Sequence, residues 1–363
     1  MSTIRPATAD DWISHRATPI EEEELGELKK EKVFCPTGPG GGVDATCKPG
    51  GRSSGGTGRA LSDEKDTQAF LAKSVESVNA WLKSPEAKKE WEEAYPKEAF
   101  DIDAFKGFTV LPNGRFWSND SDRSTNWKAQ RAVLLKTSKD VADGMDISDN
   151  DAAEFAKINN TSTVTSVKGL VRYLISDWNY DSQSPASIAI QQAAASLMKT
   201  EGARSTGTSA FLSNPVNKKV IEDFVSSVYT NTQKQMTEAG LEKMVVYRGV
   251  NGVEGDMKYE AGELDSIKMN PISSFSTSVQ QAEKFSQNDD IFRGLVVGGV
   301  VPKERVFSLS TTGLGTFSEA EAVVAHSDTD KMLVRSHKFT FTENEEGGLD
   351  FNTRYKTSDD FWN

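Results

Sequence analysis

The sequence predicts an α+β protein in which a helical stretch precedes a β-rich stretch. Between about 150 and 240, apolar residues recur at the spacing of amphipathic helices. After Gly240, short runs such as MVVYR and GLVVGGVV have the composition of strands. Helices followed by strands, rather than alternating with them, are typical of α+β folds. We therefore expect a helical lead-in and a mixed β-sheet core over residues 149–345, after a flexible Gly-rich N-terminal tail.

Composition excludes several classes of protein. No apolar run approaches the roughly 18 residues needed to span a bilayer, and the first residues lack an apolar signal core, so we expect a soluble, cytoplasmic chain without membrane contact. A formal charge of −12 argues against nucleic acid as a partner, because such binding neutralises phosphates. Two cysteines and three histidines are too scattered for a zinc signature, so no metal is expected. Cys35 and Cys47 either form a disulfide or remain free thiols.

Four segments are expected along the chain. Residues 1–60 form an acidic and Gly-rich tail without a periodic apolar face. Residues 61–148 form a small mixed α/β region of unknown role, which opens with a helix at Ser62 and a second helix after Ser84-Pro85 and continues with short apolar clusters separated by an Asn-Gly turn signal. Residues 149–345 form the main domain, and 346–363 form a C-terminal tail.

The main domain contains three expected helices and several expected strands. One helix carries Val167 to Trp178, and the others start at Ser184-Pro185 and Asn214-Pro215, where a polar cap precedes a proline. The expected strands lie in MVVYR, SFSTS, IFRGLVVGGVV, RVFSLS, EAEAVVA and MLVRSHKFTFTE, and a short helix in QQAEKF follows SFSTS.

Four polar residues on these strands form a candidate reaction site. A strand ends in Tyr247-Arg248-Gly249, another contains Ser276-Thr277-Ser278, and a third opens with Glu319-Ala320-Glu321. Because side chains alternate along a strand, we expect Glu319 and Glu321 to share one face. Each element alone has an ordinary explanation as a solvated charge or a polar strand face. Together, the two carboxylates suit a site that stabilises an oxocarbenium-like sugar.

The order and spacing of these residues resemble those of the arginine-specific mono-ADP-ribosyltransferases. That family combines an aromatic-Arg strand, a Ser-Thr-Ser strand, and a Glu-x-Glu preceded by a flexible turn that carries an aromatic residue. The resemblance covers about 150–345, and its helical lead-in is similar to that of clostridial binary-toxin catalytic domains. It implies an enzyme that uses NAD as a substrate, needs no metal, and transfers ADP-ribose to an arginine of a target protein.

The resemblance also implies a role for each residue. Arg248, with Gly249, would bind the phosphates and ribose of NAD. Ser276 and Thr277 would also bind NAD, and Ser276 would orient Glu321. Glu321 would bind the nicotinamide ribose and stabilise the charge that develops as nicotinamide leaves. Glu319 would take a proton from the acceptor. Two aromatic residues have two explanations each: Phe317 contacts the target or belongs to the core, and Phe285 packs near nicotinamide or belongs to the core.

The segment FCPTGPGGGVDATCKPG, residues 34–50, resembles a short segment of some tailed-phage head-associated proteins, including ones fused to ADP-ribosyltransferase domains. This implies a virion protein, with phage head proteins as partners, that is delivered into the host bacterial cytoplasm. An unstructured Gly linker explains the segment equally well.

Three other functions stay open: an NAD glycohydrolase, a virion structural protein with an inactive transferase-like domain, and a secreted toxin.

Overall fold

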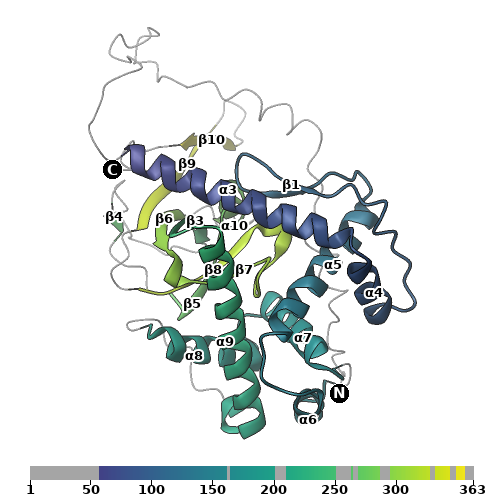
Figure 1. The fold of residues 1–363 in the computed structure, drawn as a ribbon. Helices are drawn as coiled ribbons and strands as arrows, with labels where there is room; N and C mark the ends of the chain where they lie inside the picture. Colours follow the sequence, from purple (N-terminus) through teal and green to yellow (C-terminus); the bar gives the residue numbers. More distant parts are fainter. Residues whose placement is uncertain are drawn as a thin grey trace, which may run out of the picture. The chain divides into compact units, whose positions relative to one another are not determined.

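The computed structural model describes residues 57–161, 164–200, 210–250, 263–264, 269–286, 295–327, 332–343 and 349–355. The chain divides into two compact units, Met1–Arg59 and Ala60–Asn363. Residues 1–56 of the predicted N-terminal tail, with Cys35, Cys47 and the Gly-rich segment, lie outside the described residues, whereas residues 57–60 belong to a helix and not to a tail. The second unit mixes helices and strands, so the α+β class is confirmed (Figure 1). It does not divide at residue 148, where the sequence suggested a domain boundary.

The described helices begin at polar caps that the sequence displays. Ser84, Ser184 and Asn214 each accept hydrogen bonds from backbone N–H groups of the first turn, and a proline follows each of them. The three helices expected in the main domain are confirmed as α7, which is capped by Ser166, and as α8 and α9. The α-helices are α3 (Thr57–Leu82), α4 (Pro85–Ala94), α5 (Arg123–Ala142), α6 (Asp149–Ile158), α7 (Val167–Tyr180), α8 (Pro185–Met198), α9 (Pro215–Glu238) and α10 (Val279–Ser286). Short 3-10 helices are η1 (Ala210–Ser213), η2 (Lys303–Arg305) and η3 (Phe317–Glu319). None of the helices within the described ranges is long and apolar enough to cross a bilayer.

The strands form two sheets in which every pairing is antiparallel. A small hairpin pairs β1 (Phe108–Val110) with β2 (Phe116–Ser118). The large sheet has the order β10-β9-β6-β3-β5-β8-β7, and β4 pairs with β9. The strand β10 lies in the segment that the sequence suggested to be a C-terminal tail. The large sheet contains β3 (Lys243–Val250), β4 (Glu263–Leu264), β5 (Ile272–Ser276), β6 (Leu295–Pro302), β7 (Val306–Leu309), β8 (Glu321–Ala325), β9 (Met332–Glu343) and β10 (Leu349–Tyr355).

Helices cover both faces of the large sheet. Along β8, Ala322 and Val324 face a core shared with α3, α5 and the β1–β2 hairpin, whereas Val323 and Ala325 face a core shared with α7, α8 and α9. This alternation is what an extended strand buried on both sides requires. Because residues of the 61–148 segment and of the sheet share one core, the structure does not separate that segment from the main domain.

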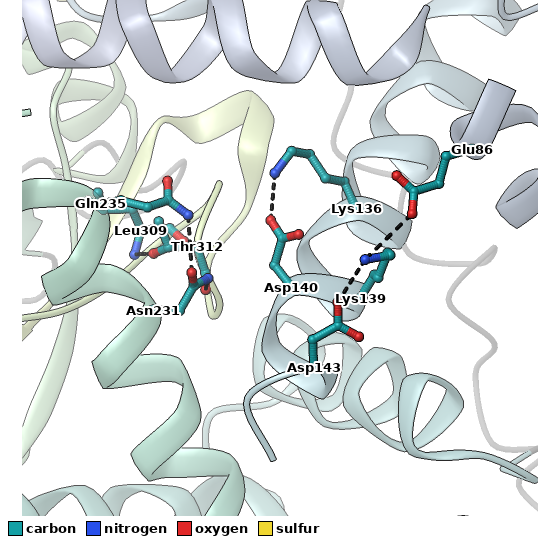
Figure 2. A network of polar contacts seen from close by, with 9 residues as sticks. All are labelled: Glu86, Lys136, Lys139, Asp140, Asp143, Asn231, Gln235, Leu309 and Thr312. Atoms are coloured by element: carbon teal, nitrogen blue, oxygen red, sulfur yellow. Dashed lines mark hydrogen bonds and ion pairs between the residues drawn. The ribbon is translucent and has the colours of Figure 1, made fainter. Parts of the chain in front are cut away.

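Ion pairs support the helical side of the molecule. Lys139 of α5 bonds Asp143 one turn later at 2.7 Å and also pairs with Glu86 of α4 at 3.5 Å (Figure 2). Lys136 pairs with Asp140 on the same helix. These contacts tie α4 to α5, the helix that carries much of the core next to the hairpin.

Candidate functional site

The large sheet changes character between β3 and β5. Along its other side β3 pairs with β6 over eight residues, Lys243 to Val250, but it pairs with β5 only at Tyr247↔Ser276. Further along β3, the N–H of Val245 donates instead to the hydroxyl of Thr67 on α3, at 3.0 Å. One residue pair therefore joins β3 to β5 within the large sheet. The candidate residues lie at this junction.

Three neighbouring strands carry three of the four candidate residues, and two of the three, Ser276 and Glu321, lie directly opposite each other. Tyr247 lies opposite Ser276, and Ser276 lies opposite Glu321, so one row crosses β3, β5 and β8. Arg248 follows Tyr247 directly. Cross-strand neighbours have Cβ atoms about 5 Å apart, so Ser276 and Glu321 are direct neighbours.

The guanidinium of Arg248 lies over the neighbouring strand. Its Nη1 donates to the carbonyl of Ser274, and its Cζ is 5.7 Å from the centre of the Phe275 ring. Desolvation lowers the pKa of Arg248, while the charge of Glu321 acts in the opposite direction. An arginine stays protonated at neutral pH even so. The site therefore combines a half-buried cation with a nearby carboxylate.

Ser276, Thr277 and Ser278 form a corner between β5 and α10. The Ser276 hydroxyl donates to the carbonyl of Glu319 at 2.7 Å and accepts from the N–H of Ser278 at 3.0 Å. Ser278 in turn accepts from the N–H of Gln281 in the first turn of α10. The family resemblance implied that Ser276 orients the Glu321 carboxylate. In the structure its proton points instead to the Glu319 backbone, so it fixes the turn that leads to both acids.

Glu321 is buried and its carboxylate is held by the backbone. Glu321 is 7% exposed, and its Oε2 accepts a hydrogen bond from the N–H of Thr316 at 2.7 Å. Gly315, with φ +125, permits this approach, since a Cβ there would lie 3.2 Å from the Cβ of Glu321. The backbone carbonyl of Glu321 also accepts from the N–H of Ser310 at 3.0 Å. The carboxylate is therefore positioned before any substrate binds.

Glu319 does not lie on the strand, which corrects the expectation that Glu319 and Glu321 share a strand face. Glu319 ends the 3-10 helix η3, and β8 begins only at Glu321. Between them Ala320 has φ 48 and ψ 45, a left-handed conformation. The alternation of side chains applies to extended backbone, and a left-handed residue interrupts it. Glu319 is half-buried.

The turn before the two acids is buried and tied to α9. The N–H of Leu309 donates to the Thr312 hydroxyl at 2.9 Å, and Asn231 of α9 donates to the Thr312 carbonyl at 2.8 Å (Figure 2). The Thr232 hydroxyl lies 2.7 Å from that of Thr312. A Cβ on Gly313 would lie 2.5 Å from Val228 of α9. The family resemblance implied a flexible turn here, whereas residues 310–315 are buried.

The two aromatic candidates lie in different surroundings. Phe317 is 7% exposed, and its ring centre is 4.8 Å from that of Phe108 and 4.7 Å from that of Phe116. Of its two explanations, the core placement is the one that the structure shows. Phe285, on α10, is 37% exposed and does not belong to a buried cluster among the described residues. Gly249 is half-buried and pairs with Val296 of β6.

Sequence reasoning missed two groups that support the site. One is the backbone N–H of Thr316, which no residue type could reveal. The other is the β1–β2 turn, whose Gly114 carbonyl accepts from the Thr277 hydroxyl at 3.3 Å. The Asn113-Gly114 dipeptide is a strong hairpin signal, but it does not show what the hairpin contacts.

Comparison of the chain with protein-family models, with curated proteins and with solved structures found no match. In the part of the chain that the structure describes, no group of three His, Cys, Asp or Glu side chains is arranged to hold a metal ion.

Proposed function

We propose that this chain is an NAD-dependent mono-ADP-ribosyltransferase that modifies arginine side chains. The observation that carries the proposal is the placement of Arg248, Ser276 and Glu321 on three adjacent strands, where the charge of Glu321 acts on Arg248, with Glu319 in the turn that enters the third strand. The three-part motif of the sequence favours the same function. A cation, a hydroxyl and two acids at one junction of a sheet support it.

These residues fit the chemistry of NAD. A planar guanidinium suits the two phosphates, and a carboxylate accepts hydrogen bonds from ribose hydroxyls. In the proposed reaction the bond between the ribose C1′ and nicotinamide breaks, and its electron pair leaves with nicotinamide. Glu321, held by Thr316, stabilises the positive charge that develops on the sugar. An acceptor guanidinium nitrogen then bonds to C1′, and Glu319 takes its proton.

The test incubates the purified chain with labelled NAD and a bacterial lysate and follows both labelled protein and free nicotinamide. We expect Glu321→Ala to lower NAD cleavage by about 10²–10³-fold, the usual cost of removing a group that stabilises developing charge. We expect Glu319→Ala to lose transfer and to keep part of the hydrolysis. Glu242→Ala is the matched control, since Glu242 is exposed and pairs with Lys303 outside the site.

The outcomes separate the alternatives. Labelled bands with the wild type and with Glu242→Ala, but not with Glu321→Ala, support the transferase. Rapid release of nicotinamide without labelled protein replaces it by an NAD glycohydrolase, in which water is the acceptor. No NAD turnover replaces it by a structural role for an inactive transferase-like domain. Equal and total loss in both acid variants contradicts the division of roles between Glu319 and Glu321.

The target and the route to it are part of the same proposal. A host bacterial protein carrying the acceptor arginine is the proposed partner, and carriage in a phage particle is the proposed route. Both depend on the resemblance of residues 34–50, which lie outside the described residues. Mass spectrometry of labelled bands identifies the target.

A further inference from the structure

The β1–β2 hairpin lies far before the candidate site in the sequence, yet it contacts both the Ser-Thr-Ser corner and the 3-10 turn that carries Glu319. At its turn, the Gly114 carbonyl accepts from the Thr277 hydroxyl, and Asn113 Nδ2 donates to Gln280 Oε1 at 2.6 Å, with separations of 163 and 167 residues. The contact is close, since a Cβ on Gly114 would lie 2.4 Å from the Thr277 carbonyl oxygen.

The strands of the hairpin contact the other segment of the site. Phe108 lies on β1 and Phe116 lies on β2, and the rings of both residues contact the ring of Phe317. Phe317 is the first residue of η3, whose last residue is Glu319. The hairpin therefore contacts the Ser-Thr-Ser corner at its turn and the Glu319 turn along its strands.

The hairpin is bonded to α3, and its turn is closed by local hydrogen bonds. Asn79 of α3 bonds both backbone groups of Phe108, donating to its carbonyl and accepting from its N–H, each at 2.8 Å. At the turn, Leu111 donates to the Arg115 carbonyl at 2.8 Å, and Gly114 donates to the Leu111 carbonyl at 2.9 Å. Gly114 has φ +79, which favours glycine.

The feature that needs this support is the backbone at Ala320. Its left-handed conformation is disfavoured for a residue with a Cβ and persists only where its surroundings impose it. Both the N–H and the hydroxyl of Thr277 donate to the Ala320 carbonyl, at 3.0 and 3.2 Å. The same hydroxyl contacts Gly114, so the hairpin turn and the Ala320 turn meet on one side chain.

We propose that the β1–β2 hairpin is a positioning element of the candidate site, which holds Thr277 and Phe317 so that Glu319 is presented in the correct direction to the acceptor. This rests on the proposed transferase function and assigns a role to part of the 61–148 segment. Gly114, Asn113 and Thr277 act through Glu319 and do not touch the reacting atoms. Misplacing a catalytic group by about 1 Å lowers the rate by about 10²-fold.

The test compares Gly114→Ala with Gly240→Ala. Both glycines have positive φ, +79 and +72, but a Cβ on Gly240 meets nothing within 4 Å, so the control carries the backbone strain without the clash against Thr277. We expect Gly114→Ala to lower kcat for transfer at least tenfold and to change KM for NAD less than about threefold, because the effect acts on geometry rather than on NAD binding. Gly240→Ala keeps the wild-type kcat.

Thr277 provides a second pair of variants that preserve its volume or its hydroxyl. Thr277→Val removes the hydrogen bonds of the hydroxyl to the Gly114 and Ala320 carbonyls and keeps the backbone bond to Ala320, and we expect it to lower kcat as Gly114→Ala does. Thr277→Ser restores the hydroxyl, and we expect it to recover most of kcat. A rise in KM with unchanged kcat in Gly114→Ala or Thr277→Val would overturn the positioning role.

Amide hydrogen exchange provides a measurement that does not depend on activity. The N–H groups of Thr277 and Ala320 donate to Ala320 and Phe317 carbonyls at 3.0 and 3.1 Å, so they report on the turn directly. We expect exchange in peptides over 276–280 and 317–322 to become at least tenfold faster in Gly114→Ala and to stay unchanged in Gly240→Ala. Unchanged exchange in Gly114→Ala would overturn the inference. If the wild type does not turn over NAD, the proposed function fails, and exchange alone decides whether the hairpin holds the turn.

Discussion

The placement of Phe317 makes a measurable prediction about stability. Its ring is buried between Phe108 and Phe116, two residues before Glu319. Replacing a buried Phe by Ala costs about 3–5 kcal/mol, from lost burial and the cavity left behind. Each of the two aromatic pairs contributes about 0.5–1.5 kcal/mol of specific ring interaction. We expect Phe317→Ala to lower the free energy of unfolding by about 3–5 kcal/mol and Phe317→Leu by about 1–3 kcal/mol.

Urea unfolding followed by tryptophan fluorescence measures these losses, with Phe285→Ala as the control. Phe285 is 37% exposed, so we expect its truncation to cost less than about 1 kcal/mol. If Phe317→Ala unfolds within about 0.5 kcal/mol of the wild type but modifies target proteins poorly, Phe317 contacts the target and the core assignment is refuted. Intact stability together with intact transfer would refute both explanations.

Two further predictions concern buried charges away from the site. Arg131 is enclosed by aromatic rings, with its Cζ 3.7 Å from the Tyr95 ring centre, and it pairs with Glu98 at 2.7 Å. Lysine lacks the planar fork that makes these contacts, and the 38% exposure of Glu98 limits the cost of losing them. We expect Arg131→Lys to lower the free energy of unfolding in urea by about 2–3 kcal/mol, and a loss below about 0.5 kcal/mol would contradict this. Burial raises the pKa of Asp177 above 3.8, against the opposing hydrogen bond from Ser184, so its stabilising contribution is complete below that unfolded value and is lost as pH rises through the folded pKa. Asp177→Asn cannot ionise, so its Tm relative to the wild type should increase between about pH 4 and pH 7, and a constant difference would disprove the assignment.

Local signals account for the part of the fold that the sequence predicts well. The caps Ser84, Ser184 and Asn214 each precede a proline, and each marks a helix start to the residue. The helix α5 was missed because its buried face includes polar side chains, Arg131, Thr137 and Ser138 among them, so no apolar period is visible. The burial of Arg131 depends on its ion pair with Glu98, which lies 33 positions away in the sequence.

The candidate site shows the same division between local and long-range information. The strands that carry Arg248, Ser276 and Glu321 were predicted, because their composition is that of strands. The position of Glu319 was not, because the left-handed Ala320 depends on Thr277 and on the packing of Phe317. The sequence did not predict that β3 and β5 would share a single residue pair either, since that depends on the hydrogen bond between β3 and Thr67 of α3.

The two acids are supported in different ways, and this difference bears on their proposed roles. Glu321 is buried and its carboxylate already accepts a backbone hydrogen bond, whereas Glu319 is half-buried at the end of a 3-10 turn. A group that stabilises a developing charge is most effective when fixed in advance, because no reorganisation is then needed during the reaction. A base that receives a proton from an incoming protein needs an accessible side chain within hydrogen-bond reach of it. Support for Glu321 comes from the turn fixed by α9, and support for Glu319 comes through the hairpin. Disturbing the turn fixed by α9 should therefore impair NAD cleavage and ADP-ribose transfer alike. Disturbing the hairpin should impair transfer more than cleavage.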